Sequence, residues 1–230
     1  MLYAKDMTPS PLRVLALFLG EVSLIQVGAK ASRSGIHKRP VPEAWLDATG
    51  LRGDQVVNKR YHGGPDQAAY LYPQPDALAW ETHGLPADLG RSYWGENVRL
   101  DGLSSADIRP GDRLHLGKVV LEATAPRLPC AVAAAYLSDV YGGPFVKDFY
   151  ALGRPGIYVR VLQPGLLRVG DVGELEPGDP QAPTLAELMA LHKRRKPDPE
   201  TLHRALRSPL SYRLREEVAE KLTKVESAVS

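Results

Sequence analysis

Short apolar runs separated by turn residues dominate the first three quarters of the chain. Runs of strand length occupy residues 14–19, 22–27, 97–100, 114–116, 119–123 and 157–162. Glycine and proline turn signals separate them, among them Asp101-Gly102, Arg109-Pro110-Gly111-Asp112 and Gln163-Pro164-Gly165. Many short strands closed by such turns predict a mainly β fold, either a sandwich or a barrel.

Two stretches inside this β region carry a helical pattern instead. The first covers residues 67–82 and is interrupted by Pro73 and Pro75, and the second covers residues 131–139. We therefore expect helices inserted between the strands.

The pattern changes after residues 178–183, which are rich in glycine and proline and predict a linker. Thr184 and Glu187 have the spacing of a capping box ahead of an apolar helical run. A second helix is expected to start at Asp198, because Pro199 then takes the first helical position, where proline is favoured.

A third C-terminal helix is expected to open at Ser208-Pro209. Apolar residues then recur at helical spacing, at Leu210, Leu214, Val218 and Leu222. Three short helices fold poorly alone, so they should pack on one another and on the β region. The sequence thus predicts a β domain over residues 1–177 and a three-helix subdomain over residues 184–230.

The apolar run 14–19 follows basic residues and has some features of a signal peptide. It is short, and Gly20-Glu21 interrupts it where a signal peptide would continue. We interpret it as a core strand and expect a cytoplasmic protein. No apolar run approaches the length that spans a membrane.

Composition supports a folded domain and excludes few functions. Hydrophobic residues make up 43% and charged residues 24% of the 230 residues, enough for an ordinary core. The net charge of +2 is too small to argue for stable nucleic-acid binding. The basic stretch 192–196 is interpreted as a solvated helix end, with docking of an acidic electron-transfer partner as the alternative.

Cys130 is the single cysteine of the chain, so it cannot form an internal disulfide. Any chemistry it performs must use the thiolate, as a nucleophile or as a soft metal ligand. Arg127 is near enough in sequence to lower its pKa. Most free cysteines are only small buried hydrophobes, and the cysteine segment alone favours that interpretation.

Three motifs in order change this balance: His62-Gly63-Gly64, Gly95-Glu96-Asn97 and Arg127-Leu128-Pro129-Cys130. Together they resemble the MOSC family, named after the C-terminal part of molybdenum cofactor sulfurases, and its YiiM-type branch in particular. Residues 36–41 and 153–158 extend the resemblance. It implies a β-barrel with inserted helices followed by a three-helix appendage.

The resemblance implies molybdenum cofactor, a molybdenum–pterin group, with Cys130 as the protein ligand to the metal. A single cysteine suffices there, because the pterin brings two dithiolene sulfurs of its own. A structural zinc site would need four protein ligands at short paired spacings, which the sequence lacks.

His62 could donate a proton to a leaving oxygen or hydrogen-bond an oxo group; the alternative is a solvated turn histidine. Gly63 and Gly64 would let backbone amides approach the cofactor, or would only form a tight turn. Lys38 is a candidate for the pterin phosphate and for the reactive centre, with ordinary surface charge as the alternative.

The remaining cofactor-binding candidates are Arg127, Asn97 and Arg154. Arg127 could lower the Cys130 pKa and also grip an anion. Asn97 offers a donor and an acceptor to the edges of a pterin, or it caps backbone groups. Arg154 is a further phosphate candidate.

The first functional hypothesis is an oxidoreductase that reduces N-hydroxylated compounds such as 6-hydroxylaminopurine-like bases and amidoximes. His62 or Lys38 would assist protonation. The electrons would come from a separate flavin or iron–sulfur partner, because no cysteines remain for a cluster and no G-x-G-x-x-G marks a dinucleotide site.

Two other hypotheses stay open. The chain could be a molybdenum cofactor carrier or a sulfur-transfer protein that uses a Cys130 persulfide, although it lacks the pyridoxal-phosphate portion that would supply sulfur. A Cys130–His62 pair could instead perform thiol hydrolysis without a metal. The sequence also leaves a homodimer open.

Overall fold

The computed structural model describes residues 11–60 and 62–227, and its main feature is a closed barrel of seven strands. Neighbouring strands follow the order β13-β9-β10-β11-β7-β8-β1, and pairing of β1 with β13 closes the barrel. All neighbours are antiparallel except β7 and β8, which are parallel. The barrel strands are β1 (Leu12–Gly20), β7 (Ala69–Pro73), β8 (Val98–Asp101), β9 (Arg113–Leu116), β10 (Val119–Ala125), β11 (Ile157–Gln163) and β13 (Val172–Glu176).

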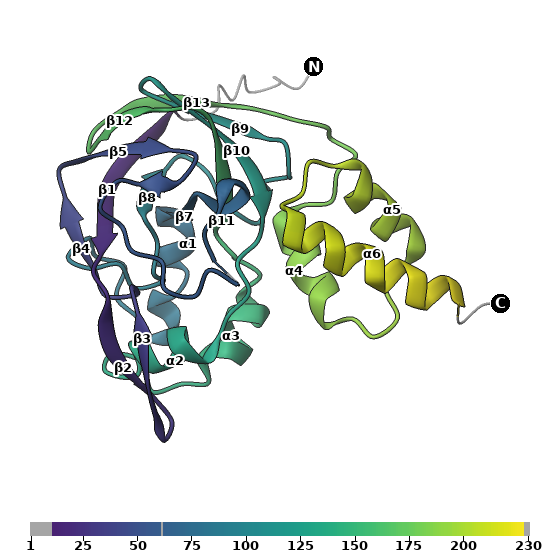
Figure 1. The fold of residues 1–230 in the computed structure, drawn as a ribbon, viewed down its shortest axis with the longest axis horizontal. Coiled ribbons are helices and arrows are strands. Elements are labelled where there is room, and N and C mark those ends of the chain that lie inside the picture. The colour runs from purple at the N-terminus through teal and green to yellow at the C-terminus, as the bar shows by residue number, and fades with distance from the viewer. Residues whose placement is uncertain (1–10, 61, 228–230) are drawn as a thin grey trace, which may run out of the picture.

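Six shorter strands decorate the barrel. β4 (Lys38–Val41) pairs with β1 outside the closed ring, and a separate small sheet has the order β12-β5-β6. The hairpin of β2 and β3 projects from one end of the barrel (Figure 1). Their bounds are β2 (Ser23–Val27), β3 (Lys30–Ser34), β5 (Glu43–Asp47), β6 (Gly50–Leu51) and β12 (Gly165–Arg168).

The helices form two groups. Short helices lie between the strands, namely η1 (Pro65–Gln67), α1 (Gln74–Leu78), η2 (Glu81–His83), α2 (Ala131–Leu137) and α3 (Phe145–Leu152). The C-terminal group is α4 (Leu185–Lys193), α5 (Pro199–Arg207) and α6 (Tyr212–Ser227), which lies beside the barrel (Figure 1). The predicted β-barrel with inserted helices and three C-terminal helices is therefore confirmed.

Two apolar clusters hold these parts together. One fills the barrel and includes leucines of the C-terminal group, such as Leu188 and Leu202, so the appendage shares the barrel core. The other is aromatic and lies under α1 to α3, where Tyr72 stacks on Trp94 with ring centroids 4.4 Å apart. Stacked and edge-on aromatic pairs add specificity to the area that they bury.

The helix predicted over residues 67–82 is wrong for most of its length. Residues Ala69–Pro73 form strand β7, which pairs with β11 and β8, and α1 is confined to Gln74–Leu78. Every residue of β7 is buried, so the run lacks the alternation that distinguishes a strand from a buried helix. The predicted helix at residues 131–139 exists as α2.

The appendage begins as the sequence predicts. Thr184 and Glu187 form a complete capping box, and the Asp198 carboxylate accepts a hydrogen bond from the Thr201 amide at the start of α5. The third helix starts later than Ser208, at Tyr212, because the Ser211 amide donates to the Thr124 carbonyl of β10 and ties this segment to the barrel.

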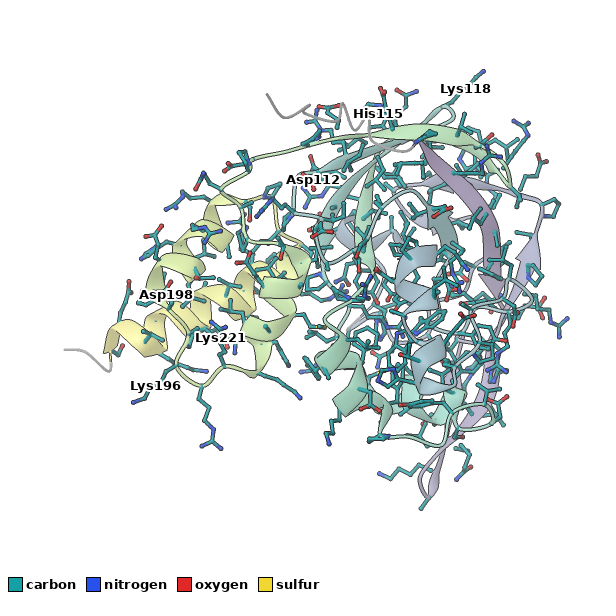
Figure 2. The ribbon with its side chains drawn as sticks, turned by 180° about the vertical axis from the view of Figure 1, so that it is seen from behind. Asp112, His115, Lys118, Lys196, Asp198 and Lys221 are labelled. Carbon is teal, nitrogen blue, oxygen red and sulfur yellow. The ribbon has the colours of Figure 1, made fainter. Side chains whose placement is uncertain are left out.

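Charged groups cover the outside of both parts. Seen from behind, His115 and Lys118 lie on the barrel, and Lys196, Asp198 and Lys221 lie on the appendage (Figure 2). In the part of the chain that the structure describes, no helix is long and apolar enough to span a membrane.

Candidate functional site

Two adjoining cavities open where the barrel, α2 and the appendage meet. The inner chamber, about 230 Å³, lies between the barrel end and residues 32–36, 38, 54–58 and 62–63. The outer chamber, about 490 Å³, lies between the segment 125–132 and helices α4 and α6. Residues that line both chambers include His62, Arg127, Cys130 and Tyr158.

Cys130 sits at the junction of the two chambers. It is half-buried and immediately precedes α2, at the end of the segment that follows β10. Pro126 and Pro129 restrict the backbone of this segment, which makes the turn from strand to helix. The thiol is therefore accessible from both cavities while its backbone is held in place.

A buried ion pair forms one wall of the inner chamber. Lys38 Nζ lies 2.6 Å from both carboxylate oxygens of Asp54, and both side chains are 7% exposed. The same carboxylate accepts hydrogen bonds from the Gly20 amide (2.7 Å) and from the Asn97 side-chain amide (2.9 Å). Burial lowers the pKa of Lys38, Asp54 opposes the shift, and the charge of Arg127 adds to it.

Arg127 supplies the second buried cation. Its Nη1 donates to the Trp94 carbonyl at 2.5 Å, and its guanidinium lies 4.8 Å from the centre of the Tyr70 ring. Gly95 explains why the chain accepts this arginine, since a Cβ there would lie 3.1 Å from Nη1 and the local φ is +72°. The glycine of the Gly95-Glu96-Asn97 motif thus makes room for Arg127.

His62 faces both chambers and is neutral at pH 7. Burial lowers its pKa to about 4, and the charges of Arg127, Arg213 and Lys38 add to the shift. Its Nδ1 lies 2.9 Å from the hydroxyl of Tyr158. Burial raises the pKa of Tyr158, so the phenol stays protonated, and its hydrogen bond with His62 fixes the orientation of the imidazole.

The loop that carries His62 is held by the appendage. Arg213 of α6 donates to the carbonyls of Lys59 (2.7 Å) and Gly63 (3.0 Å) and to Oε1 of Gln67 (2.7 Å). Tyr158 and Arg213 were not among the sequence-predicted residues. Tyr158 lies in the resemblance segment 153–158, whereas nothing in the sequence links Arg213 to a loop 150 positions earlier.

Three further predicted residues, Gly63, Gly64 and Asn97, lie at or beside the inner chamber. Gly63 lines the inner chamber, and Gly64 caps η1 with a φ of +87°. Asn97 lines the chamber, but its amide oxygen accepts from the Tyr70 amide and its nitrogen donates to Asp54 and Phe18. Asn97 therefore positions the Lys38 partner and does not offer a free edge.

Arg154 lies apart from the two chambers. It pairs with the fully buried Asp76 at 2.9 Å and lies outside the lining of both chambers. Glu96 is likewise structural, because its buried carboxylate binds Arg99 at 2.5 Å, the Ser92 hydroxyl and the Trp94 amide. The Gly95-Glu96-Asn97 motif thus builds the wall of the site, and none of its side chains is free to bind a ligand.

The resulting site combines one accessible thiol, a neutral imidazole and two buried cations. Such a set can bind an anionic group and present a soft ligand beside a proton donor. Within residues 11–60 and 62–227, no three His, Cys, Asp or Glu side chains gather as a metal-binding group. One thiol is the ligand that a metal carried by an organic cofactor would need from the protein.

Comparison with known proteins agrees with this arrangement. The profile of the MOSC domain matches residues 58–174, about half of the chain. The chain is 32% identical over 159 residues to the uncharacterized protein YflK of Bacillus subtilis, covering 68% of this chain and 70% of YflK. The chain belongs to the MOSC domain family.

Other MOSC relatives carry the name YiiM. Protein YiiM of Escherichia coli is 34% identical over 115 residues, which are 46% of this chain and 49% of that protein. The crystal structure of YiiM from Geobacillus stearothermophilus matches 92% of this MOSC protein and all of its own chain, with a TM-score of 0.71 and 24% identity. The crystal structure of YiiM from Escherichia coli matches 94% of both chains, with a TM-score of 0.70 and 22% identity. These structures establish the shared fold, appendage included.

Proposed function

We propose that this MOSC protein binds molybdenum cofactor through Cys130 and reduces N-hydroxylated compounds, such as 6-hydroxylaminopurine-like bases and amidoximes. The observation that carries the proposal is the junction, where the Cys130 thiol shares one continuous cavity with His62, Arg127 and Lys38. The reducing electrons come from a separate flavin or iron–sulfur protein.

The residues of the inner chamber fit the cofactor. Lys38 and Arg127 are buried cations suited to an anionic phosphate tail, and Gly63 leaves its backbone close to the cavity. Cys130 would hold the metal as a thiolate. When bound, the cofactor would supply the two-electron chemistry of the reduction.

The protein residues supply protons and position. Conversion of R–NHOH to R–NH₂ consumes two electrons and two protons and releases water, so protons must reach the leaving oxygen. Lys38 is an ammonium group whose pKa burial lowers, which makes it a better acid. The hydrogen bond of His62 with Tyr158 fixes the imidazole, which can pass a proton toward the leaving oxygen.

The electron donor is proposed to be separate because this chain holds one cysteine in total, too few to bind an iron–sulfur cluster. Lys193, in the basic stretch 192–196, already packs on the ring of Tyr150 at 3.9 Å. Residues 194–196 are exposed and are the basic residues that an acidic partner would contact.

The first experiment compares wild type with Cys130→Ser, both purified anaerobically from a host that makes the cofactor. Molybdenum content, pterin fluorescence and reduction of 6-hydroxylaminopurine and benzamidoxime with a chemical donor are measured. We expect near-stoichiometric metal and activity in wild type and loss of both in Cys130→Ser. Ser138→Ala, an exposed change at the end of α2, should keep both.

Three outcomes would contradict the proposal. Wild type that repeatedly contains neither molybdenum nor pterin would show that the protein does not bind the cofactor. A wild type that holds cofactor and a persulfide on Cys130, yet reduces none of the substrates, would favour the carrier or sulfur-transfer function. Metal retained in Cys130→Ser would show that Cys130 is not the ligand to the metal.

A further inference from the structure

The outer chamber is shaped by two parts of the chain that lie far apart in sequence. The segment 125–132 forms the barrel side, and α4 and α6 form the other side. α4 and the start of α6 are the parts of the appendage nearest the barrel (Figure 1). Its volume, about 490 Å³, is within the range of small-molecule binding sites.

The barrel side presents mostly apolar side chains, and the helical side adds two leucines. Pro126, Leu128 and Val132 line the barrel side, and Leu188 and Leu214 line the helical side. Leu214 is half-buried, so part of it stays open to the chamber. Walls of this kind bind an apolar ring by removing its surface from water.

Polar side chains also line this chamber, and His62, Arg127, Tyr158, Arg213 and Glu217 each have a hydrogen-bond partner within the protein. Arg213 donates to the loop of His62, and the Glu217 carboxylate lies 2.6 Å from Nδ1 of the exposed His192. Glu217 is the one acidic residue that lines the outer chamber in the described part of the chain, and its second oxygen can accept a hydrogen bond. A ligand with an N–H edge fits this acceptor better than an anion does.

The two chambers therefore differ in the ligand that they suit. Arg127 lines both, but the inner one adds the buried Lys38–Asp54 pair, whereas the outer one adds the apolar side chains of the segment 125–132, two leucines and the acceptor Glu217, which suit a flat ring with N–H donors. Cys130 and His62 line both, so a ring in the outer chamber lies next to the reactive groups.

We propose that the outer chamber is the substrate-binding site, that it takes uncharged flat nitrogen heterocycles and aryl amides or amidoximes, and that Leu214 and Glu217 of α6 select among them. This inference rests on the proposed function for the reaction that follows binding. Binding itself needs no reaction, so the two can be tested apart.

The test measures binding of adenine and benzamide, which resemble the substrates but carry no N–O bond to reduce. Each is titrated by calorimetry into the protein as purified, for wild type, Leu214→Trp and Leu222→Trp. Leu222 is a matched control, since it is also partly buried on α6 but lies outside both chambers. Urea unfolding of each variant checks that it folds.

We expect Leu214→Trp to weaken both ligands by about tenfold or more, because overfilling an apolar pocket by a few carbon atoms has effects of that size. Leu222→Trp should stay within about twofold of wild type, a difference below ~0.5 kcal/mol. Glu217→Gln should weaken adenine more than benzene, a ligand without an N–H donor.

If Leu214→Trp does not fold, Leu214→Ala replaces it and should admit a bulkier analogue, 2-naphthamide, that wild type binds poorly. Equal affinities in wild type, Leu214→Trp and Leu222→Trp, or no binding of either ligand to wild type, would overturn the inference. Binding that depends on Leu214 in a protein without reductase activity would support the chamber and refute the reaction. Reductase activity with a KM unchanged by Leu214→Trp would do the reverse.

Discussion

The inner and outer chambers meet at Cys130 but are built on different principles. In the inner chamber the charged side chains of Lys38, Asp54 and Arg127 are buried, and each has a partner. The outer chamber owes one wall to helices that lie beyond the region matched by the MOSC profile, residues 58–174. The barrel thus contributes the charged and reactive groups, whereas the appendage contributes one wall of the outer chamber and the Arg213 contacts that hold the His62 loop.

Breaking the buried pair should have the largest effect on stability. Asp54→Asn leaves Lys38 buried without its counter-charge and weakens the bonds to Gly20 and Asn97. We expect the free energy of unfolding to fall by about 3–5 kcal/mol, as for other buried pairs that lose one member. Urea unfolding followed by circular dichroism measures it.

The exposed pair of Glu43 and Arg168 provides a matched comparison for the buried Lys38–Asp54 pair. Glu43→Gln breaks the exposed pair with Arg168, in which both side chains are at least half exposed, and should cost less than about 1 kcal/mol. The double variant Lys38→Met with Asp54→Asn should recover much of the lost stability, since it removes the unpaired charge. Equal losses for Asp54→Asn and Glu43→Gln would show that the pair is not buried in solution.

His62, at the junction of the chambers, should make the free energy of unfolding depend on pH, and this effect should be smaller than the loss in Asp54→Asn. Its pKa is about 4 in the folded protein and about 6.5 in an unfolded chain. Between these values the unfolded chain binds the proton and the folded protein does not, so stability falls as pH drops from 6.5 toward 4. His62→Gln removes this contribution of His62 to the pH dependence of stability.

Unfolding free energies at pH 7 and pH 4.5 test the prediction. The loss between the two pH values should be about 2 kcal/mol smaller in His62→Gln than in wild type. His203→Gln, on the exposed face of α5, should lose as much as wild type. An equal loss of unfolding free energy between pH 7 and pH 4.5 in all three proteins would show that His62 is solvated in the folded protein.

Much of the fold followed from local patterns. The strand at 14–19, the capping box at Thr184 and the helix after Cys130 are each signalled by neighbouring residues, and the structure confirms them. β7 did not follow, because both of its faces are buried and its apolar run has no period. Only its partners β8 and β11 make it a strand.

The site was predictable where a motif names a residue and unpredictable where a partner comes from elsewhere. His62, Arg127 and Cys130 belong to motifs, and the structure places them around one cavity. The pairing of Arg154 with Asp76 spans 78 positions and left no local signal. Long-range pairing of this kind is decided by the folded topology, which the sequence alone does not display.

The smallest of the three expected losses of stability comes from the contact between α6 and the loop that carries His62. Arg213→Met removes the donors that hold the His62 loop from α6, and the site is half-buried. We expect a loss of about 1–2 kcal/mol in global stability, the scale of a few partly solvated hydrogen bonds. Amide exchange in the segment 53–64 should speed up while exchange in the barrel strands changes little.

Hydrogen exchange followed by mass spectrometry separates this local loosening from a general loss of stability. Arg207→Met is the control, because it removes an exposed pair with Glu200 from the same appendage, where both side chains are more than half exposed. If segment 53–64 exchanges equally in both variants, the appendage does not hold the loop. A selective increase in Arg213→Met would mean that the helices serve both chambers, lining the outer one and keeping His62 in place at the inner one.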